Sequence, residues 1–220
     1  MSATPILIGV PNPGPVIPRP RLLRVCESAG DRPVVFCAPS GYGKTVAACQ
    51  LAHSQGRPVL WISLSNRVVP PDLLIRRVRK EAGSMPTRSG NRAAVASSLS
   101  ESPDNPRCDL LLVLDDYGSD EGGLVDLIEA MEQLRPAGVS LCITSRHRMA
   151  PAVVRSALVI DEGILALTRA EVFGLAEAQG HRDADMSKAE DVNSECRGHV
   201  ALASALLRAA RQPGEPGTGA

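Results

Sequence analysis

The chain has 220 residues and a mass of 23.2 kDa, and 44% of its residues are hydrophobic, which suffices for one substantial core with a small appended lobe. Its 24 basic and 24 acidic residues balance, which argues against a strongly basic surface for binding nucleic acids or membranes. Only 2% of its residues are aromatic, so few side chains are available to stack on the bases of single-stranded nucleic acids. Six cysteines without a C-x-x-C pair, and no apolar run of membrane-spanning length, predict a soluble cytoplasmic protein.

The first 20 residues are a proline-rich arm, in which we expect no regular structure. A short helix is predicted over 21–29. A buried strand is predicted over 34–37, where four apolar residues follow one another. This strand leads directly into the most informative segment of the chain.

That segment has the pattern of a phosphate-binding loop, in its relaxed form with alanine at the first position, and a helix over 45–54 is predicted after it. Glycines let backbone N–H groups turn toward phosphate oxygens, the lysine reaches the β- and γ-phosphates, and the threonine hydroxyl faces Mg²⁺. The alternative is a glycine-rich turn before an ordinary helix. The candidate nucleotide-binding residues are Ala38, Pro39, Ser40, Gly41, Tyr42, Gly43, Lys44, Thr45 and Val46.

A strand over 59–64 and a helix over 72–81 come next. The helix carries a basic cluster that we interpret as a solvated face, since its apolar residues are spaced to face inward. The segment 83–106 is rich in serine, arginine, asparagine and proline, which predicts a loop around a short helix at 93–99.

An uninterrupted apolar run over 110–114 ends in two adjacent carboxylates, Asp115 and Asp116. Strands buried on both faces of a parallel sheet have this pattern, and their carboxyl ends lie at the edge that also carries the phosphate-binding loop. Asp115 is the candidate ligand of Mg²⁺, opposite Thr45, and Asp116 is the candidate group that orients or deprotonates an attacking water. The alternative is a simple turn before Gly118.

A helix is predicted over 124–134, followed by a strand over 141–144 and a last short strand over 158–160. Arg146 follows the second of these strands, where an arginine can reach a γ-phosphate, although a solvated loop arginine is equally consistent with the sequence. The alternation of strands and helices predicts an α/β fold. We expect a P-loop NTPase with a five-stranded, mainly parallel sheet flanked by helices.

The hydrophobic period changes after the last strand. Thr168 and Glu171 form a capping box that opens a helix to about residue 179, and further helices are predicted over 189–196 and 200–211. These helices predict a small α-helical lobe. The expected organisation is a proline-rich arm (1–20), a P-loop NTPase domain (21–165), the helical lobe (166–212) and a flexible tail (213–220).

A resemblance to a known family extends along nearly the whole chain and is carried by six short segments: Arg19–Leu22, Pro39–Thr45, Trp61–Leu64, Leu112–Tyr117, Thr144–Arg146 and Leu167–Glu171. They resemble the ATPase domain of the maltose-regulon activator and of the large LuxR-type transcriptional regulators related to it. Those proteins belong to the STAND class of signal-transduction ATPases. The resemblance implies an ATP/ADP switch.

In such a switch, ADP holds a closed resting form, an inducer together with ATP permits self-association, and slow hydrolysis resets the state. The resemblance implies that Lys44, Asp116 and Arg146 act in catalysis and that Thr45 and Asp115 bind the metal. It also implies that Arg21 binds the nucleotide, in addition to the residues of the loop.

The chain departs from this family in its lobe, where Gly198-His199-Val200 stands in place of the usual Gly-x-Pro near the adenine. The sensing repeats and the helix-turn-helix of the large regulators do not fit in 220 residues, so we expect an excised domain or a short stand-alone relative. Nucleotide-dependent self-association is expected, and sequence-specific DNA binding is not.

Two other functions stay open at this point. One is a small-molecule phosphotransferase built on the same loop. The lobe shows no obvious signature of the arginine-bearing lid or the acceptor pocket that a kinase has, but Arg169 and Arg197 keep this function open. The other is a degenerate nucleotide-binding module without turnover. GTP is disfavoured, because the chain has no Asn-Lys-x-Asp motif for reading guanine.

Overall fold

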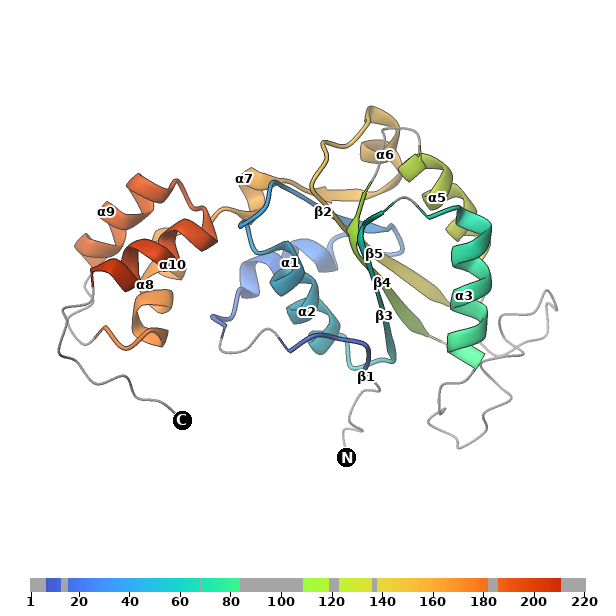
Figure 1. Ribbon diagram of the computed structural model, residues 1–220, viewed down its shortest axis with the longest axis horizontal. Helices are drawn as coiled ribbons and strands as arrows, with labels where there is room; N and C mark the ends of the chain where they lie inside the picture. Colours follow the sequence, from blue (N-terminus) through green and yellow to red (C-terminus); the bar gives the residue numbers. More distant parts are fainter. Residues whose placement is uncertain are drawn as a thin grey trace.

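Six parallel strands form one sheet in the computed structural model, which describes residues 7–12, 16–67, 69–83, 109–118, 123–135, 138–181 and 186–210 (Figure 1). The strand order is β1-β3-β4-β5-β2-β6, and all neighbours pair in parallel. The strands are β1 (Leu7–Ile8), β2 (Val34–Cys37), β3 (Val59–Arg67), β4 (Leu110–Tyr117), β5 (Val139–Ser145) and β6 (Leu158–Ile160). The predicted α/β class is confirmed.

The five predicted strands are all present, and the sheet contains β1 in addition. The expectation of no regular structure in residues 1–20 is wrong at β1, which pairs with Val59 and Leu60 of β3. An unpaired β3 would leave a row of free N–H and C=O groups at the edge of the sheet, and the apolar pair Leu7–Ile8 covers part of it. The helix predicted at 93–99 and the tail at 213–220 lie outside the described residues.

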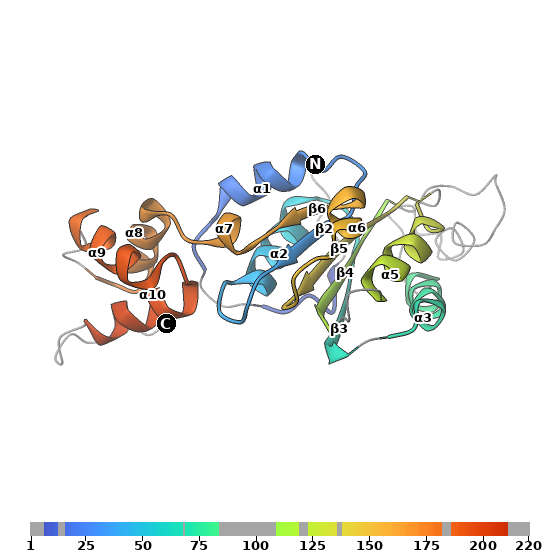
Figure 2. The ribbon, with the colours of Figure 1, turned by 90° about the horizontal axis from the view of Figure 1, so that it is seen from above.

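Helices cover both faces of this sheet. One face carries α1 (Pro20–Glu27) and α2 (Lys44–Ser54), and the other carries α3 (Pro71–Gly83), α5 (Gly123–Glu132) and α6 (Pro151–Ser156). The short α7 (Glu162–Leu165) leads to the helical lobe, in which α8 (Arg169–Ala178), α9 (Met186–Cys196) and α10 (Val200–Ala209) pack on one another beside the sheet (Figures 1 and 2). No helix within the described ranges has both the length and the apolar character that crossing a membrane requires.

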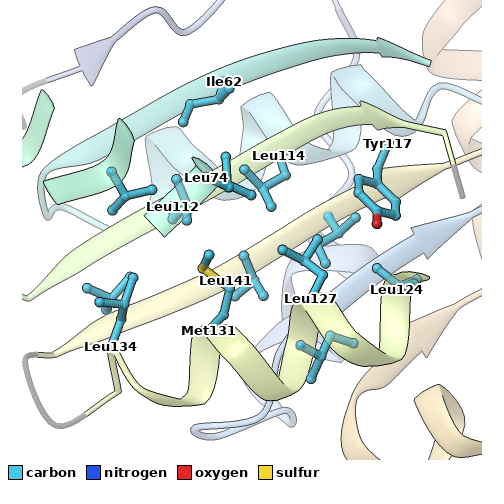
Figure 3. Close-up of a cluster of buried hydrophobic side chains, with 14 of the residues drawn as sticks. Ile62, Leu74, Leu112, Leu114, Tyr117, Leu124, Leu127, Met131, Leu134 and Leu141 are labelled. Carbon is cyan, nitrogen blue, oxygen red and sulfur yellow. The ribbon is translucent and has the colours of Figure 1, made fainter. Parts of the chain in front are cut away.

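Strand β4 lies at the centre of the core and is apolar on both faces. Leu110, Leu112 and Leu114 face the cluster beneath α3 and α5, which Figure 3 shows. Leu111 and Val113 face the opposite cluster, beneath α1 and α2. All five side chains are at most 2% exposed. Burial on two faces explains the uninterrupted apolar run in the sequence.

Two arginines near the start of α1 fix the joint between the sheet and the lobe. Arg19, only 3% exposed, places its Nε 3.2 Å from a carboxylate oxygen of Glu171 and donates to the Leu165 carbonyl at 2.7 Å. Arg21 donates to the Ile164 carbonyl at 2.8 Å and lies 3.2 Å from Glu171. Carbonyls at the end of a helix lack partners within it, so these arginines cap α7 and tie it to α8.

The carboxyl group of Glu171 makes this joint dependent on pH. Burial raises the pKa of Glu171, but hydrogen bonds from Arg19 and from the Thr168 backbone, together with the charges of Arg19 and Arg21, lower it below its ordinary value. The unfolded chain therefore takes up this proton more readily than the folded one. The contribution of Glu171 to stability is present above the unfolded pKa and is lost as the pH falls through the lower, folded pKa.

Replacing Arg19 with alanine should lower the free energy of unfolding by about 2 to 3 kcal/mol at neutral pH, because it removes partners from a buried carboxylate and from buried carbonyls. Urea unfolding measures this loss, with Arg24→Ala on the exposed side of α1 as the control. The difference between the two variants should shrink in acid, as Glu171 is protonated. Equal stability of the two variants at neutral pH would contradict the assignment.

Candidate functional site

The carboxyl ends of three strands meet at one edge of the sheet. Because β5 pairs with β2 on one side and with β4 on the other, the loop after β2, the acids of β4 and the arginine after β5 lie together. An open cavity of about 680 Å³ occupies this edge. Ligand sites of parallel α/β sheets lie at this edge, and the volume falls within their usual range of roughly 300 to 1,000 Å³.

Nine of the candidate residues line this cavity, together with groups from β3 and α10. The candidates are Ser40, Gly41, Gly43, Lys44, Thr45, Val46, Asp115, Asp116 and Arg146, and the additional residues include Ser63, Ser65, Asn66, Thr144 and Arg208. The structure therefore brings together the loop, both carboxylates and the arginine that the sequence singled out.

The loop between β2 and α2 has the backbone shape that its glycines permit. Gly41 has φ +90° and Gly43, the N-cap of α2, has φ +78°, conformations that other residues adopt at a cost. Lys44, 8% exposed, donates from Nζ to the Pro39 carbonyl at 2.9 Å. The loop thus surrounds an ammonium group that faces the cavity at the start of a helix, a position that favours anions.

The charge on Lys44 lacks full compensation in this structure. Burial lowers the pKa of its ammonium group, and the nearby Arg146 guanidinium lowers it further, while Asp116, Cys37 and Asp115 act in the opposite direction. An anion bound in the cavity would offset both the desolvation and the repulsion between the two cations. The electrostatics of the loop therefore favour a negatively charged ligand.

Asp115 is held by two hydroxyl groups. Thr45 Oγ1 donates to Asp115 Oδ1 at 3.0 Å, and Thr144 Oγ1 donates to the same oxygen at 2.7 Å. The Asp115 side chain is largely buried, and within the described part of the chain both of these hydrogen bonds go to Oδ1, which leaves Oδ2 to accept a further partner. A hydroxyl beside a carboxylate is the oxygen donor set that Mg²⁺ prefers, so Thr45 and Asp115 fit a magnesium ion.

A bulge in β4 sets the position of Asp116. Between the pairs Leu114–Ile143 and Tyr117–Ser145, β4 contains one residue more than β5, and Asp116 adopts φ +57° there. Bulges of this kind redirect side chains next to functional sites. The Asp116 carboxylate forms a bidentate ion pair with Arg146, whose Nε and second terminal nitrogen lie 2.9 and 3.1 Å from its two oxygens.

The helical lobe contacts the phosphate-binding loop through His199, the N-cap of α10. Its Nδ1 accepts the Leu202 N–H at 3.1 Å, so in the neutral ring Nε2 carries the proton and donates to the Ser40 carbonyl at 3.0 Å. The ring also meets Tyr42 edge-on, with centroids 4.8 Å apart. A Cβ atom at Gly41 would overlap the His199 ring, which gives this glycine a second reason to be present.

The remaining candidates lie around the cavity or away from it. Ala38 is buried behind the loop, where its N–H donates to Ser145. The Pro39 carbonyl accepts from Lys44, and Tyr42 packs on the lobe. Arg21 lies at the joint with α7 rather than at the cavity, and its part in nucleotide binding stays a prediction.

Sequence reasoning assigned no role to Thr144 or His199, which both touch candidate residues. Thr144 had a usable signal, since a hydroxyl near the end of a buried strand, two residues before Arg146, lies near the carboxyl end of β4 when the two strands pair in parallel. The contact of His199 with the loop depends on how the lobe packs against the sheet domain, and the pattern of residues in the sequence does not indicate this packing.

Comparisons with known proteins identify the fold. No family model and no curated protein matches the chain. Among solved structures, a STAND protein with a tetratricopeptide repeat sensor from Pyrococcus horikoshii superposes with a TM-score of 0.62 at 14% identity, over 96% of this chain and 32% of that protein. A RuvB variant from Thermotoga maritima superposes with a TM-score of 0.51 at 14% identity, over 87% of this chain and 61% of RuvB.

The chain has the fold of a P-loop NTPase. It spans about a third of the length of the STAND protein that it matches. Identities of this size show the fold alone. In this fold, the strand order places β5, with Thr144 near its end and Arg146 directly after it, between the strand of the loop and the strand of the acids.

His199→Ala should loosen the lobe from the phosphate-binding loop, because it removes the N-cap of α10 and the bond to Ser40. Loss of an N-cap costs about 1 kcal/mol. Hydrogen exchange should accelerate in α10 and in the loop and stay unchanged in β4, which the core protects. His181→Ala, just beyond α8, is the matched control. Unchanged exchange in the loop of the His199 variant would contradict the assigned contact.

Proposed function

We propose that this P-loop NTPase binds ATP and ADP with Mg²⁺, hydrolyses ATP slowly and acts as a signal-transduction switch. One observation carries the proposal: Lys44, the Thr45–Asp115 pair and the Asp116–Arg146 pair all face one cavity. A cation on a preformed loop, a carboxylate with a hydroxyl and a second carboxylate near an arginine are the groups that phosphoanhydride hydrolysis uses.

The loop binds the polyphosphate. The N–H groups of the first turn of α2, which have no partner within the helix, and the Lys44 ammonium group attract the phosphate oxygens, and the anion replaces the Pro39 carbonyl as the partner of Lys44. Thr45 and Asp115 hold the magnesium ion, which neutralises charge on the β- and γ-phosphates when it is bound. Thr144 keeps Asp115 in place through its hydroxyl.

Asp116 and Arg146 act on the terminal phosphate. A water oxygen bonds to the γ-phosphorus as the bond from that phosphorus to the bridging oxygen breaks, and ADP and phosphate leave. Asp116 orients this water and accepts its proton. The Arg146 guanidinium binds oxygens of the γ-phosphate, where negative charge must be stabilised in the transition state.

The switch belongs, in this proposal, to a regulator of the large LuxR type. The motif resemblance supports it, and so does the STAND-like fold. ADP holds the resting form and ATP permits self-association of this chain. Sequence-specific DNA recognition is not assigned to the described helices, since formal charges balance over the whole chain.

Lys44→Ala should weaken ATP and ADP binding by about 2 kcal/mol, roughly thirty-fold, because a charge-assisted contact with phosphate is lost. Isothermal titration calorimetry with Mg²⁺ measures both affinities. Lys188→Ala, on an exposed position of α9, is the control and should bind like the unaltered protein. Unchanged affinity in the Lys44 variant would refute nucleotide binding by this loop.

Asp116→Asn should retain ATP binding and lose ATP turnover by at least roughly a hundred-fold, since proton acceptance from water acts only in the transition state. Single-turnover release of phosphate separates this effect from binding. Asp191→Asn, on the exposed face of α9, provides a control with the same change of charge. Turnover by Asp116→Asn at the unaltered rate would disprove the role of this carboxylate, and the lack of turnover in the unaltered protein would favour a binding module.

A further inference from the structure

In the structure, the Asp116 carboxylate and the Arg146 guanidinium are paired with each other, whereas the proposed reaction requires the carboxylate to bind water and the guanidinium to bind phosphate. Both carboxylate oxygens of Asp116 accept from the guanidinium, at 2.9 and 3.1 Å. A carboxylate in this arrangement has its best acceptor positions occupied, and the guanidinium has one of its bidentate edges occupied. The pair must open before Asp116 binds water and before Arg146 binds phosphate through that edge.

The pair is built into the sheet. The Asp116 N–H donates to Thr144 Oγ1 at 2.8 Å, and Thr144 is 1% exposed. Thr144 and Arg146 lie on the same strand end, so one hydroxyl fixes the Asp116 backbone beside the guanidinium that pairs with its side chain. The Asp116 side chain is 24% exposed, and the Arg146 side chain, which lines the cavity, is 48% exposed.

The two nucleotides differ in what they offer Arg146. In the proposed function, the loop binds the phosphates that ATP and ADP share, whereas Arg146, which lines the same cavity and pairs with Asp116, binds only the third phosphate of ATP. A terminal phosphate carries more negative charge and more acceptor oxygens than a carboxylate, and it competes for a bidentate arginine. ADP ends one phosphate short and has no group for this competition.

We propose that the Asp116–Arg146 pair is a selector for the terminal phosphate, an inference that rests on the proposed function. ATP opens the pair by binding Arg146, and the opening frees both oxygens of Asp116 for the attacking water. ADP leaves the pair closed. Asp116 therefore has a second role besides accepting a proton: it weakens triphosphate binding by holding Arg146, and it leaves diphosphate binding unaffected.

A double-mutant cycle tests this coupling by calorimetry, with Mg²⁺ and either ADP or a non-hydrolysable ATP analogue. Asp116→Asn should bind the analogue roughly five-fold more tightly than the unaltered protein, since the competing ion pair is gone, and should bind ADP within two-fold. Arg146→Ala should bind the analogue more weakly and ADP unchanged. In the Arg146→Ala background, adding Asp116→Asn should no longer change the affinity for the analogue.

The alternatives give different results. If Asp116 weakened binding only by repelling phosphate, Asp116→Asn would still increase the affinity for the ATP analogue in the Arg146→Ala background. This result would overturn the proposal. An equal gain for both nucleotides would overturn it as well. If the unaltered protein binds both nucleotides and the cycle is additive, only the selector fails. If it binds neither, the proposed function fails with it.

A second measurement follows the unaltered protein, and a variant serves only to assign the signal. The Nε–H signal of Arg146 in ¹⁵N-correlated NMR spectra, assigned by its loss in Arg146→Lys, reports the partner of this guanidinium. It should shift on addition of the ATP analogue and keep its position on addition of ADP. A shift of the same size with both nucleotides would contradict selection by the terminal phosphate.

Discussion

The pairing of β5 between β2 and β4 is the constraint on which the candidate site depends. Parallel strands end at the same edge, so this order alone brings together the loop after β2, the acids of β4 and Arg146 after β5. The core determines the register, because a shift of β4 by one residue would exchange Leu112 and Val113 between opposite faces. Apolar packing thereby determines that the Thr144 hydroxyl reaches Asp115 at 2.7 Å.

Irregular backbone is concentrated where the site needs it. Asp116 has φ +57° in the β4 bulge, and Ser65 and Asn66 have φ +52° and +59° in the neighbouring irregularity of β3. Non-glycine residues pay roughly 1 kcal/mol or more for such conformations, and they persist where surrounding contacts hold them. At Asp116 these contacts are the Thr144 hydroxyl on its N–H and the Arg146 guanidinium on its carboxylate.

Much of the fold and most of the candidate site could be predicted from the sequence, for physical reasons. Strands buried on two faces produce continuous apolar runs, as at 110–114, and a phosphate-binding loop has a dense local pattern of glycine, lysine and threonine. Features that rest on contacts between distant segments could not be predicted. The joint formed by Arg19 joins residues about 150 positions apart in sequence, and the bond from His199 to Ser40 spans 159. Neither leaves a local pattern.

The lobe is attached at two places of unequal strength. At the joint, Arg19 is buried and bonds to a carboxylate and to helix carbonyls, so opening it would leave charged groups without partners. At the loop, the His199 bond to the Ser40 carbonyl is exposed, so water can replace either partner, and the Ala201 N–H donates to the Gly41 carbonyl at 3.0 Å. These neutral contacts of α10 therefore cost less to open than the ion pairs of the joint. Because α10 contacts the loop itself, any change of loop shape on nucleotide binding acts first on the weaker attachment.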